Sequence, residues 1–408
     1  MTIIEEEFER PVALPVPNIE ESQEDEFHTA DVVTVAAAHG AHDTYFSFLP
    51  TILPLLIINL SLTTTQAGLL SASSQIPNLL QPVIGHLADR KNLKMLVIMA
   101  PTFSGIFLTL IGVVPSFGMA AVLLLLAGFS TAGFHSIAPA MVSMRAGRKV
   151  GRGMGFFMVG GELGFALGPV VVVATIAVLT LKGLPWLMTL GMLASIILYY
   201  RLKNASTVRH SQAEASLPAR QALLEMRSLM LPIIAITFIT GFLNANLVIF
   251  LPTFMSREGA VFALAGISLT IVELGGALGV FLMSLHSDRL GQRNIALGGT
   301  LVSVAFALAF LATQGWLQYI LLFGLGMSAF VANPAFLAMI QTRFTKNSSL
   351  ANGVYMSSAF VLRSIVVVVV GMLADRYGMR PVFMGSSLAA LLAVPIILTL
   401  PASKSASS

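Results

Sequence analysis

The sequence predicts an all-α membrane protein in which twelve transmembrane helices form two six-helix, pseudo-symmetric halves. Three observations lead to this prediction. First, 56% of the 408 residues are hydrophobic and only 10% are charged, whereas soluble domains carry about 25% charged residues. Second, apolar blocks of about 20 residues, the length that crosses a bilayer, recur along the chain. Third, short motifs return in the same order in the second half of the chain.

The apolar blocks predict twelve spans between two tails. Residues 1–30 are expected to be a disordered acidic cytoplasmic tail, and 401–408 a short cytoplasmic tail. The longest polar connection, 202–230, is a predicted cytoplasmic linker between a bundle over 31–201 and a second bundle over 231–400. The predicted spans are 31–57, 66–87, 94–114, 118–144, 152–175, 184–201, 231–255, 262–285, 294–313, 317–342, 350–373 and 381–400.

The basic residues predict how the chain is oriented. With the N-terminus in the cytoplasm, 18 of the 23 lysines and arginines fall in cytoplasmic segments, and Arg363 alone falls within a span. Because positive charge is retained on the cytoplasmic side, we expect a multi-pass inner-membrane protein with both termini inside. Scattered basic residues argue against a nucleic-acid partner. The absence of cysteine excludes thiolate metal ligands.

Short sequence motifs are repeated about 200 residues apart. The matching pairs are FLPT at 48–51 and 250–253, AGLLS at 67–71 and AGISL at 265–269, and ADRKNLK at 88–94 and SDRLGQR at 287–293. Parallel repeats of this kind are typical of transporters whose binding site lies between the two halves.

The loop after the second span reads GHLADRKNLK, which resembles the GxLaDrxGrk signature of the major facilitator superfamily. A second copy follows the eighth span, and a third, GMLADRYGMR, follows the eleventh span on the outside. We expect the aspartates of the first two copies to meet positive helix N-termini of the opposite half and latch the cytoplasmic side. The gating residues are Gly85, Asp89, Arg90, Asp288 and Arg289.

The fifth span resembles the superfamily's antiporter signature. Its matching residues are Gly155, Gly164, Gly168 and Pro169. We expect these small residues to let the span approach helices of the opposite half closely. Together with HGAHD in the first span and GFHSIAP in the fourth, the signature makes the chain similar to the fosmidomycin-resistance-like branch. This resemblance implies the major facilitator fold, alternating access and proton-driven drug export.

The first span contains two histidines and a carboxylate on one helix face, because their positions follow the i, i+3, i+4 spacing. The repeats pair His42 with Asn244 and His135 with Asn333, and the resemblance places these residues on cavity-lining helices. Ionisable groups within a membrane usually mark ion or substrate pathways, and histidine changes charge near neutral pH. The expected proton-coupling and substrate residues are His39, His42, Asp43, His135, Asn244, Asn246 and Asn333.

Two other interpretations of the histidines remain. They could form hydrogen bonds between packed helices, or they could bind a metal, although the lack of thiols makes that signal weak. We therefore expect no metal and no cofactor. Three further charges lie within spans: Glu162, Glu273 and Arg363. Arg363 is expected either to neutralise one of the glutamates or to attract an anionic substrate.

The sequence thus predicts a secondary active transporter, not an enzyme, that exports small drug-like or organic-acid molecules by proton antiport. The expected partners are protons, a small-molecule substrate and membrane lipid, and the expected state is a monomer. A proton-coupled importer of a small metabolite is the alternative. From another class, the rival is an intramembrane metal-dependent hydrolase that uses the histidines and Asp43.

Overall fold

The computed structural model describes residues 27–88, 91–203, 219–344 and 348–402, and this part of the chain is helical throughout, with short connections. Most of the predicted N-terminal tail and part of the predicted linker lie outside the described residues. Helix α9 begins at Ala219, so its first turns overlap the linker that the sequence places over 202–230.

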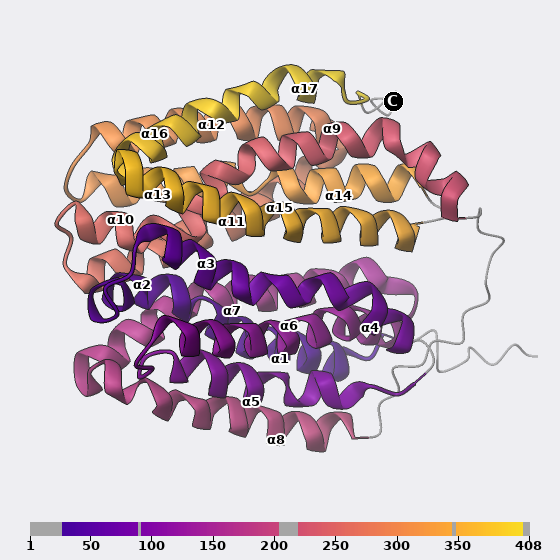
Figure 1. Cartoon of the computed structure of the whole chain (residues 1–408). Helices are drawn as coiled ribbons and strands as arrows, with labels where there is room; N and C mark the ends of the chain where they lie inside the picture. The colour runs from indigo at the N-terminus through magenta and orange to yellow at the C-terminus, as the bar shows by residue number, and fades with distance from the viewer. Residues whose placement is uncertain (1–26, 89–90, 204–218, 345–347, 403–408) are drawn as a thin grey trace, which may run out of the picture.

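The first six predicted spans form one bundle, which we call the N-half (Figure 1). Its helices are α1 (Thr29–Phe46), α2 (Phe48–Asn59), α3 (Thr64–Gln75), η2 (Ile76–Leu80), α4 (Gln81–Ala88), α5 (Lys94–Leu110), α6 (Phe117–Arg145), η3 (Gly147–Lys149), α7 (Val150–Leu179), η4 (Leu181–Leu187) and α8 (Met188–Leu202).

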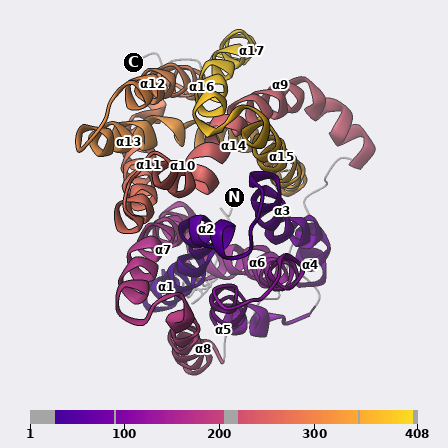
Figure 2. The same cartoon turned by 60° about the vertical axis from the view of Figure 1, so that its left-hand side comes forward.

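The last six predicted spans form the second bundle, the C-half. Its helices are α9 (Ala219–Ala245), η5 (Asn246–Phe250), α10 (Leu251–Arg257), α11 (Phe262–Leu290), α12 (Gln292–Ala312), α13 (Leu317–Ala329), α14 (Ala332–Arg343), α15 (Ser348–Tyr377), α16 (Met379–Ala389), η7 (Ala390–Leu392) and α17 (Ala393–Thr399). The two bundles lie side by side in both views (Figures 1 and 2).

Ten helical segments in the described part of the chain are long and apolar enough to cross a membrane. The other two predicted spans are α3–η2–α4, which is interrupted at residues 76–80, and α5, whose 17 residues are fewer than an upright span usually has. The fold class predicted from the sequence, an all-helical membrane protein of two six-span halves, is therefore confirmed.

The FLPT repeat produces the same kind of irregularity in both halves. In the N-half, α1 ends before Ser47 and α2 begins at Phe48. In the C-half, α9 passes through a π-helical turn over residues 246–250 before α10 begins at Leu251. Each motif places a proline in the first turn of the second helix, where a missing backbone N–H costs little.

The halves meet mainly through three helix pairs, α2 with α10, α3 with α15, and α7 with α11, and α15 also contacts η2 while α2 also contacts η5 and α11. We call the end that holds Thr64, Glu258 and Tyr377 the external end, as the charge bias predicts. Along α3 and α15 the backbones almost touch, because a Cβ added to Gly68 would lie 2.6 Å from the carbonyl oxygen of Val367. A Cβ added to Gly371 would likewise lie 2.5 Å from the carbonyl oxygen of Thr64.

Asp375 of the C-half caps helix α3 of the N-half. The backbone N–H of Thr64 donates to its Oδ1 at 2.6 Å, and the backbone N–H of Thr65 donates to its Oδ2 at 2.8 Å. The Thr65 hydroxyl also donates to Oδ2, at 2.6 Å. Thr63 and Gln66 form a capping box with each other. All four backbone donors at the start of α3 are thus satisfied, two of them by a residue of the opposite half.

The glycines of the fifth span correct one expectation from the sequence. They pack α7 against α1 of the same half, not against the opposite half. A Cβ added to Gly164 would lie 2.1 Å from the carbonyl oxygen of Gly40, and one added to Gly168 would lie 2.3 Å from that of Thr44. Gly155 has no atom near its missing Cβ, so it takes no part in this packing. The motif therefore holds the first span firmly against α7.

Candidate functional site

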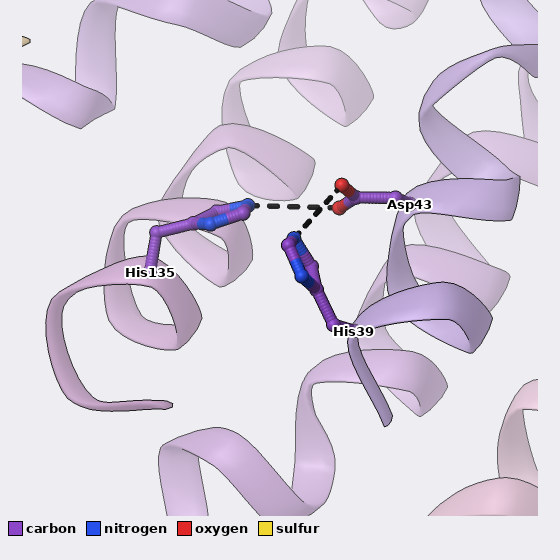
Figure 3. A group of neighbouring side chains, drawn as sticks. All are labelled: His39, Asp43 and His135. Carbon is purple, nitrogen blue, oxygen red and sulfur yellow. Dashed lines mark ion pairs between the residues drawn. The ribbon is translucent and has the colours of Figure 1, made fainter. Parts of the chain in front are cut away.

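Three ionisable side chains meet in the N-half, near the middle of α1 and α6 (Figure 3). The Nε2 atom of His39 lies 3.0 Å from Oδ2 of Asp43, and Nε2 of His135 lies 3.6 Å from Oδ1 of the same carboxylate. The side chain of His39 is 6% exposed, whereas those of Asp43 and His135 are 19% and 27% exposed. The carboxylate is therefore within reach of water on the His135 side.

Helix α7 fixes the orientation of His39. Its ring stacks on Phe157, with 4.0 Å between the ring centroids, and its Nδ1 lies 2.8 Å from the carbonyl oxygen of Phe157. Gly161 leaves space for the ring, since a Cβ there would lie 2.4 Å from Cε1. A carbonyl oxygen only accepts hydrogen bonds, so Nδ1 must carry a proton.

This tautomer determines what the pair can do. With Nδ1 protonated, neutral His39 carries a lone pair on Nε2, which lies 3.0 Å from Oδ2 of Asp43. The angles are poor, so Nε2 has no hydrogen-bond partner among the described residues despite this short distance. Two lone pairs so close repel each other, whereas one additional proton between them makes a charge-assisted hydrogen bond. The geometry therefore favours a bound cation.

A proton is the smallest such cation, but the spacing also suits a metal ion. The ligand atoms of His39, Asp43 and His135 all lie within 4.8 Å of one another. Three protein ligands would leave further coordination positions open, as in catalytic zinc sites. The side chains present are therefore compatible with both ions.

His42 is near the cluster but is buried elsewhere. Its side chain is completely covered, and Nδ1 lies 2.9 Å from the hydroxyl of Ser104 on α5. Its Nε2 lies 3.4 Å from the hydroxyl of Thr131 on α6. The face that the sequence assigns to all three first-span residues is thus divided: His39 and Asp43 meet His135, whereas His42 ties α1 to α5 and α6.

The asparagines paired by the repeat occupy different places in the C-half. Asn244 and Asn333 line a cavity of about 10 Å³ together with Thr300 and Ser303, which has room for about one water molecule. Asn246 is 2% exposed and donates to the carbonyl oxygen of Phe242 and to a hydroxyl on α16. In this structure the amide of Asn246 is thus used within the bundle, and its assignment to the substrate cavity stays a prediction.

The other three charges that the sequence places within spans lie where the two halves face each other. Glu162 and Val173 lie on the same face of α7. That face packs against α11, because a Cβ added to Gly266 of α11 would lie 2.7 Å from the side chain of Val173. Glu273 lies one turn beyond Thr270, whose hydroxyl donates to the carbonyl oxygen of Ala166 at 2.8 Å. Both glutamates therefore sit on the facing surfaces of α7 and α11.

Arg363 faces the same interior from α15. It lies about half a turn around the helix from Ile365 and Met372, which are exposed on the outer face. Arg363 is nevertheless solvent-exposed, and no described residue gives it a hydrogen bond or an ion pair within 4.0 Å. Its guanidinium lies 5.8 Å from the ring centroid of Phe360.

The predicted cytoplasmic latch cannot be placed. Asp89 and Arg90 lie outside the described residues, as does the side chain of Asp288, while Gly85 and Arg289 make no contact with the opposite half that the structure describes. Sequence reasoning gave no role to Asp375, although the third motif copy, GMLADRYGMR, contains it. That copy was the available signal for a contact at the external end.

Comparison with known proteins agrees with this architecture. The sequence model of the Major Facilitator Superfamily matches residues 35–366. The chain is 25% identical over 361 residues to the fosmidomycin resistance protein of Escherichia coli (strain K12), covering 86% of this chain and 87% of that protein. It is 23% identical over 360 residues to the uncharacterized MFS-type transporter YfnC of Bacillus subtilis (strain 168), covering 86% and 88%.

Solved structures support the fold at lower sequence identity. A bacterial homologue of the human lysosomal transporter Spinster, in an inward-facing and occupied conformation, superposes with a TM-score of 0.76 at 13% identity, over 91% of this chain and 96% of that one. A D-xylose–proton symporter superposes with a TM-score of 0.70 at 16% identity, over 92% and 98%.

Proposed function

Because the chain belongs to the Major Facilitator Superfamily and is thus a multi-pass secondary transporter, we propose that it exports small drug-like or organic-acid molecules in exchange for protons. The family excludes the metal-dependent hydrolase considered from the sequence. The bacterial relatives and the charge bias support a place in the cytoplasmic membrane with both termini inside.

The observation that carries the proposal is the contact of His39 and His135 with the carboxylate of Asp43. The hydrogen bond from His39 to Phe157 leaves the other ring nitrogen beside the carboxylate of Asp43. The cluster is therefore more stable with one exchangeable proton bound than without it. The partial exposure of Asp43 and His135 gives that proton a route to water. Proton binding here removes the repulsion between His39 and Asp43 of α1 and so favours one arrangement of the helices around them.

Export is proposed over import because of the antiporter-like signature and because the fosmidomycin resistance protein carries resistance in its name. Alternating access supplies the mechanism. The carrier turns outward with substrate bound and returns with a proton bound, and it does not change orientation when neither is bound. An importer would require proton and substrate to load together.

The test uses the purified protein in liposomes that carry a pH-sensitive dye and an imposed pH gradient. Compounds come from a growth-inhibition screen of a deletion strain, with fosmidomycin included. We expect an active compound to cause protons to cross the liposome membrane through the wild-type protein. It should not do so through Asp43→Asn, in which an amide replaces the proton-binding carboxylate. Ser104→Ala, which removes the hydroxyl that contacts His42 and Ser130 and leaves Asp43 and its two histidine partners in place, is the matched control and should retain exchange.

Full pH-driven transport by Asp43→Asn would remove this cluster from the coupling mechanism. Proton and substrate moving in the same direction would replace the exporter with the importer. Metal analysis of the same preparation addresses the other cation, since one tightly held zinc ion per chain would assign the three side chains to metal binding instead.

A further inference from the structure

Resting on the proposed transport function, we propose that the substrate is a small zwitterion, whose anionic group binds Arg363 and whose cationic group lies between Glu162 and Glu273. The three side chains come from three helices of both halves: α7 contributes Glu162, α11 contributes Glu273 and α15 contributes Arg363. Among the described residues, none of these charges forms an ion pair with His39, Asp43 or His135, so they need an explanation of their own.

The charges occupy one level of the interface. Glu162 lies one turn before Ala166, and Glu273 lies one turn after Thr270, the two residues joined by a hydrogen bond between the halves. Because α7 and α11 run in opposite directions, both glutamates lie on the cytoplasmic side of that bond. Arg363 likewise lies one turn to the cytoplasmic side of Val367, where α15 touches Gly68 of α3. All three charges therefore lie just below the region where the halves touch.

A structural ion pair does not account for them. Such a pair brings a guanidinium nitrogen within 4.0 Å of a carboxylate oxygen, and within the described part of the chain Arg363 has no such contact. Glu162 and Glu273 nevertheless lie on the facing surfaces of α7 and α11, and Arg363 faces the same interior from α15. Glu273 is 5% exposed, whereas Arg363 is open to solvent.

The chemistry of the missing partner follows by elimination. A purely anionic ligand would satisfy Arg363 but would be repelled by Glu162 and Glu273. A purely cationic ligand would satisfy the glutamates but would be repelled by Arg363. A ligand that carries both charges pairs with each group, and buried charges in a membrane are stable only when they are paired or hydrated. An arginine also suits a planar carboxylate or a phosphonate, which it binds through two parallel hydrogen bonds.

This assignment also gives protons a second place, besides the Asp43 cluster, at which they can compete with the substrate. A cationic nitrogen and a proton cannot both occupy the carboxylates between α7 and α11. Protons that reach these glutamates therefore displace the cationic end of the substrate, and substrate that binds from the cytoplasm displaces protons. This competition takes place at the contact between the two halves. The charge held there changes with it, and so does the force between the halves.

The test uses three ligand series, built on alanine, leucine and phenylalanine, so that the result does not depend on side-chain size. Each series contains the free amino acid, its methyl ester with only the cation, its N-acetyl derivative with only the anion, and the N-acetyl methyl ester with neither. Affinity for the purified, full-length protein is measured by calorimetry. We expect the zwitterion to bind at least about tenfold more tightly than either singly charged member.

The variants assign each charge to its partner. Arg363→Gln should abolish the preference for a free carboxylate and leave the preference for a free amine. The double variant Glu162→Gln/Glu273→Gln should do the reverse. Glu258→Gln, which breaks an ion pair with Arg380 at the external end, is the control and should change neither. Melting temperatures of all variants confirm that they are folded.

The proposal is overturned if none of the three zwitterions binds the wild-type protein at millimolar concentration, if blocking either charge has no effect, or if both variants change the same preference. Its failure is distinguishable from failure of the proposed function. Asp43→Asn should lose pH-driven transport and retain the charge preferences in binding, because Asp43 contacts His39 and His135 and not Arg363.

Discussion

The contact between Asp375 and α3 predicts that a single amide substitution opens the external end of the transporter. In the structure, Asp375 accepts hydrogen bonds from the backbone N–H groups of Thr64 and Thr65 and from the Thr65 hydroxyl. Asp375→Asn retains one acceptor oxygen, directs an N–H₂ group at a backbone donor, and removes the negative charge from the positive end of α3.

The magnitude follows from these losses. Hydrogen bonds to a charged group contribute about 1.5–3 kcal/mol, and a charge at a helix N-terminus about 0.3–2 kcal/mol. Asp375 is solvent-exposed, so water replaces part of both contributions when the halves separate. We therefore expect the closed external end to lose about 1–2 kcal/mol, which shifts the ratio of closed to open molecules roughly 5–30-fold.

Thiol labelling measures this shift, because the native chain has no cysteine. Val367→Cys places a thiol at a completely buried position on α15. A membrane-impermeant maleimide added outside should label it faster when Asp375→Asn is also present. Glu258→Gln is the matched control, since its partner Arg380 belongs to the same half. Equal labelling rates with and without Asp375→Asn, or an equal increase in the control, would refute the cap as a latch.

Three further predictions concern the remaining motifs. Gly164→Ala should destabilise the protein by about 1–3 kcal/mol through overpacking, because its Cβ would lie 2.1 Å from a backbone oxygen, whereas Gly155→Ala, which meets nothing, should leave the melting temperature unchanged or raised. Asp89→Asn should increase labelling of cavity cysteines from the cytoplasmic side if its charge latches that end, an effect of about 0.3–2 kcal/mol. Asn333→Ala should weaken substrate binding without lowering the ligand-free melting temperature; the opposite pattern would identify Asn333 as a packing residue.

The fold could be predicted from the sequence because its signals are long and redundant. Apolar length locates the spans, and the FLPT repeat with the other paired motifs indicates two equivalent halves, while the orientation drawn from the charge bias stays a prediction. The partner of the glycine motif could not be predicted, because spacing shows that a helix face is small but not which neighbour lies against it. Gly164 meets Gly40 of the same half, and only the packed structure shows that.

The candidate site was predicted in part for a similar reason. Helical spacing brings His39 and Asp43 together, since residues four apart lie one above the other, and the repeat indicated His135. The same spacing cannot distinguish the exposed Asp43 from the buried His42, because adjacent positions differ by only a fraction of a turn. Ser104 and Thr131 decide the outcome, and neither carries a sequence signal of its own.

The two halves share a scaffold but not its chemistry. Where the N-half has His42 bonded to hydroxyls of α5 and α6, the C-half has Asn244 beside Ser303 and Thr300, around a cavity of about one water molecule. Where the N-half has His135, the C-half has Asn333. An amide neither gains nor loses a proton near neutral pH, so of these paired positions only those of the N-half can change charge.

This asymmetry requires communication between the halves. In the mechanism that we propose, the proton is held on α1 and α6, whereas Arg363 and Glu273, which we assign to the substrate, belong to the C-half. The helix that touches both groups is α7: its glycines and the carbonyl of Phe157 hold α1 and His39, and its Ala166 and Glu162 face α11. We therefore expect a change in charge at Asp43 to act on the substrate charges through α7, which packs tightly against α1 on one side and contacts α11 on the other.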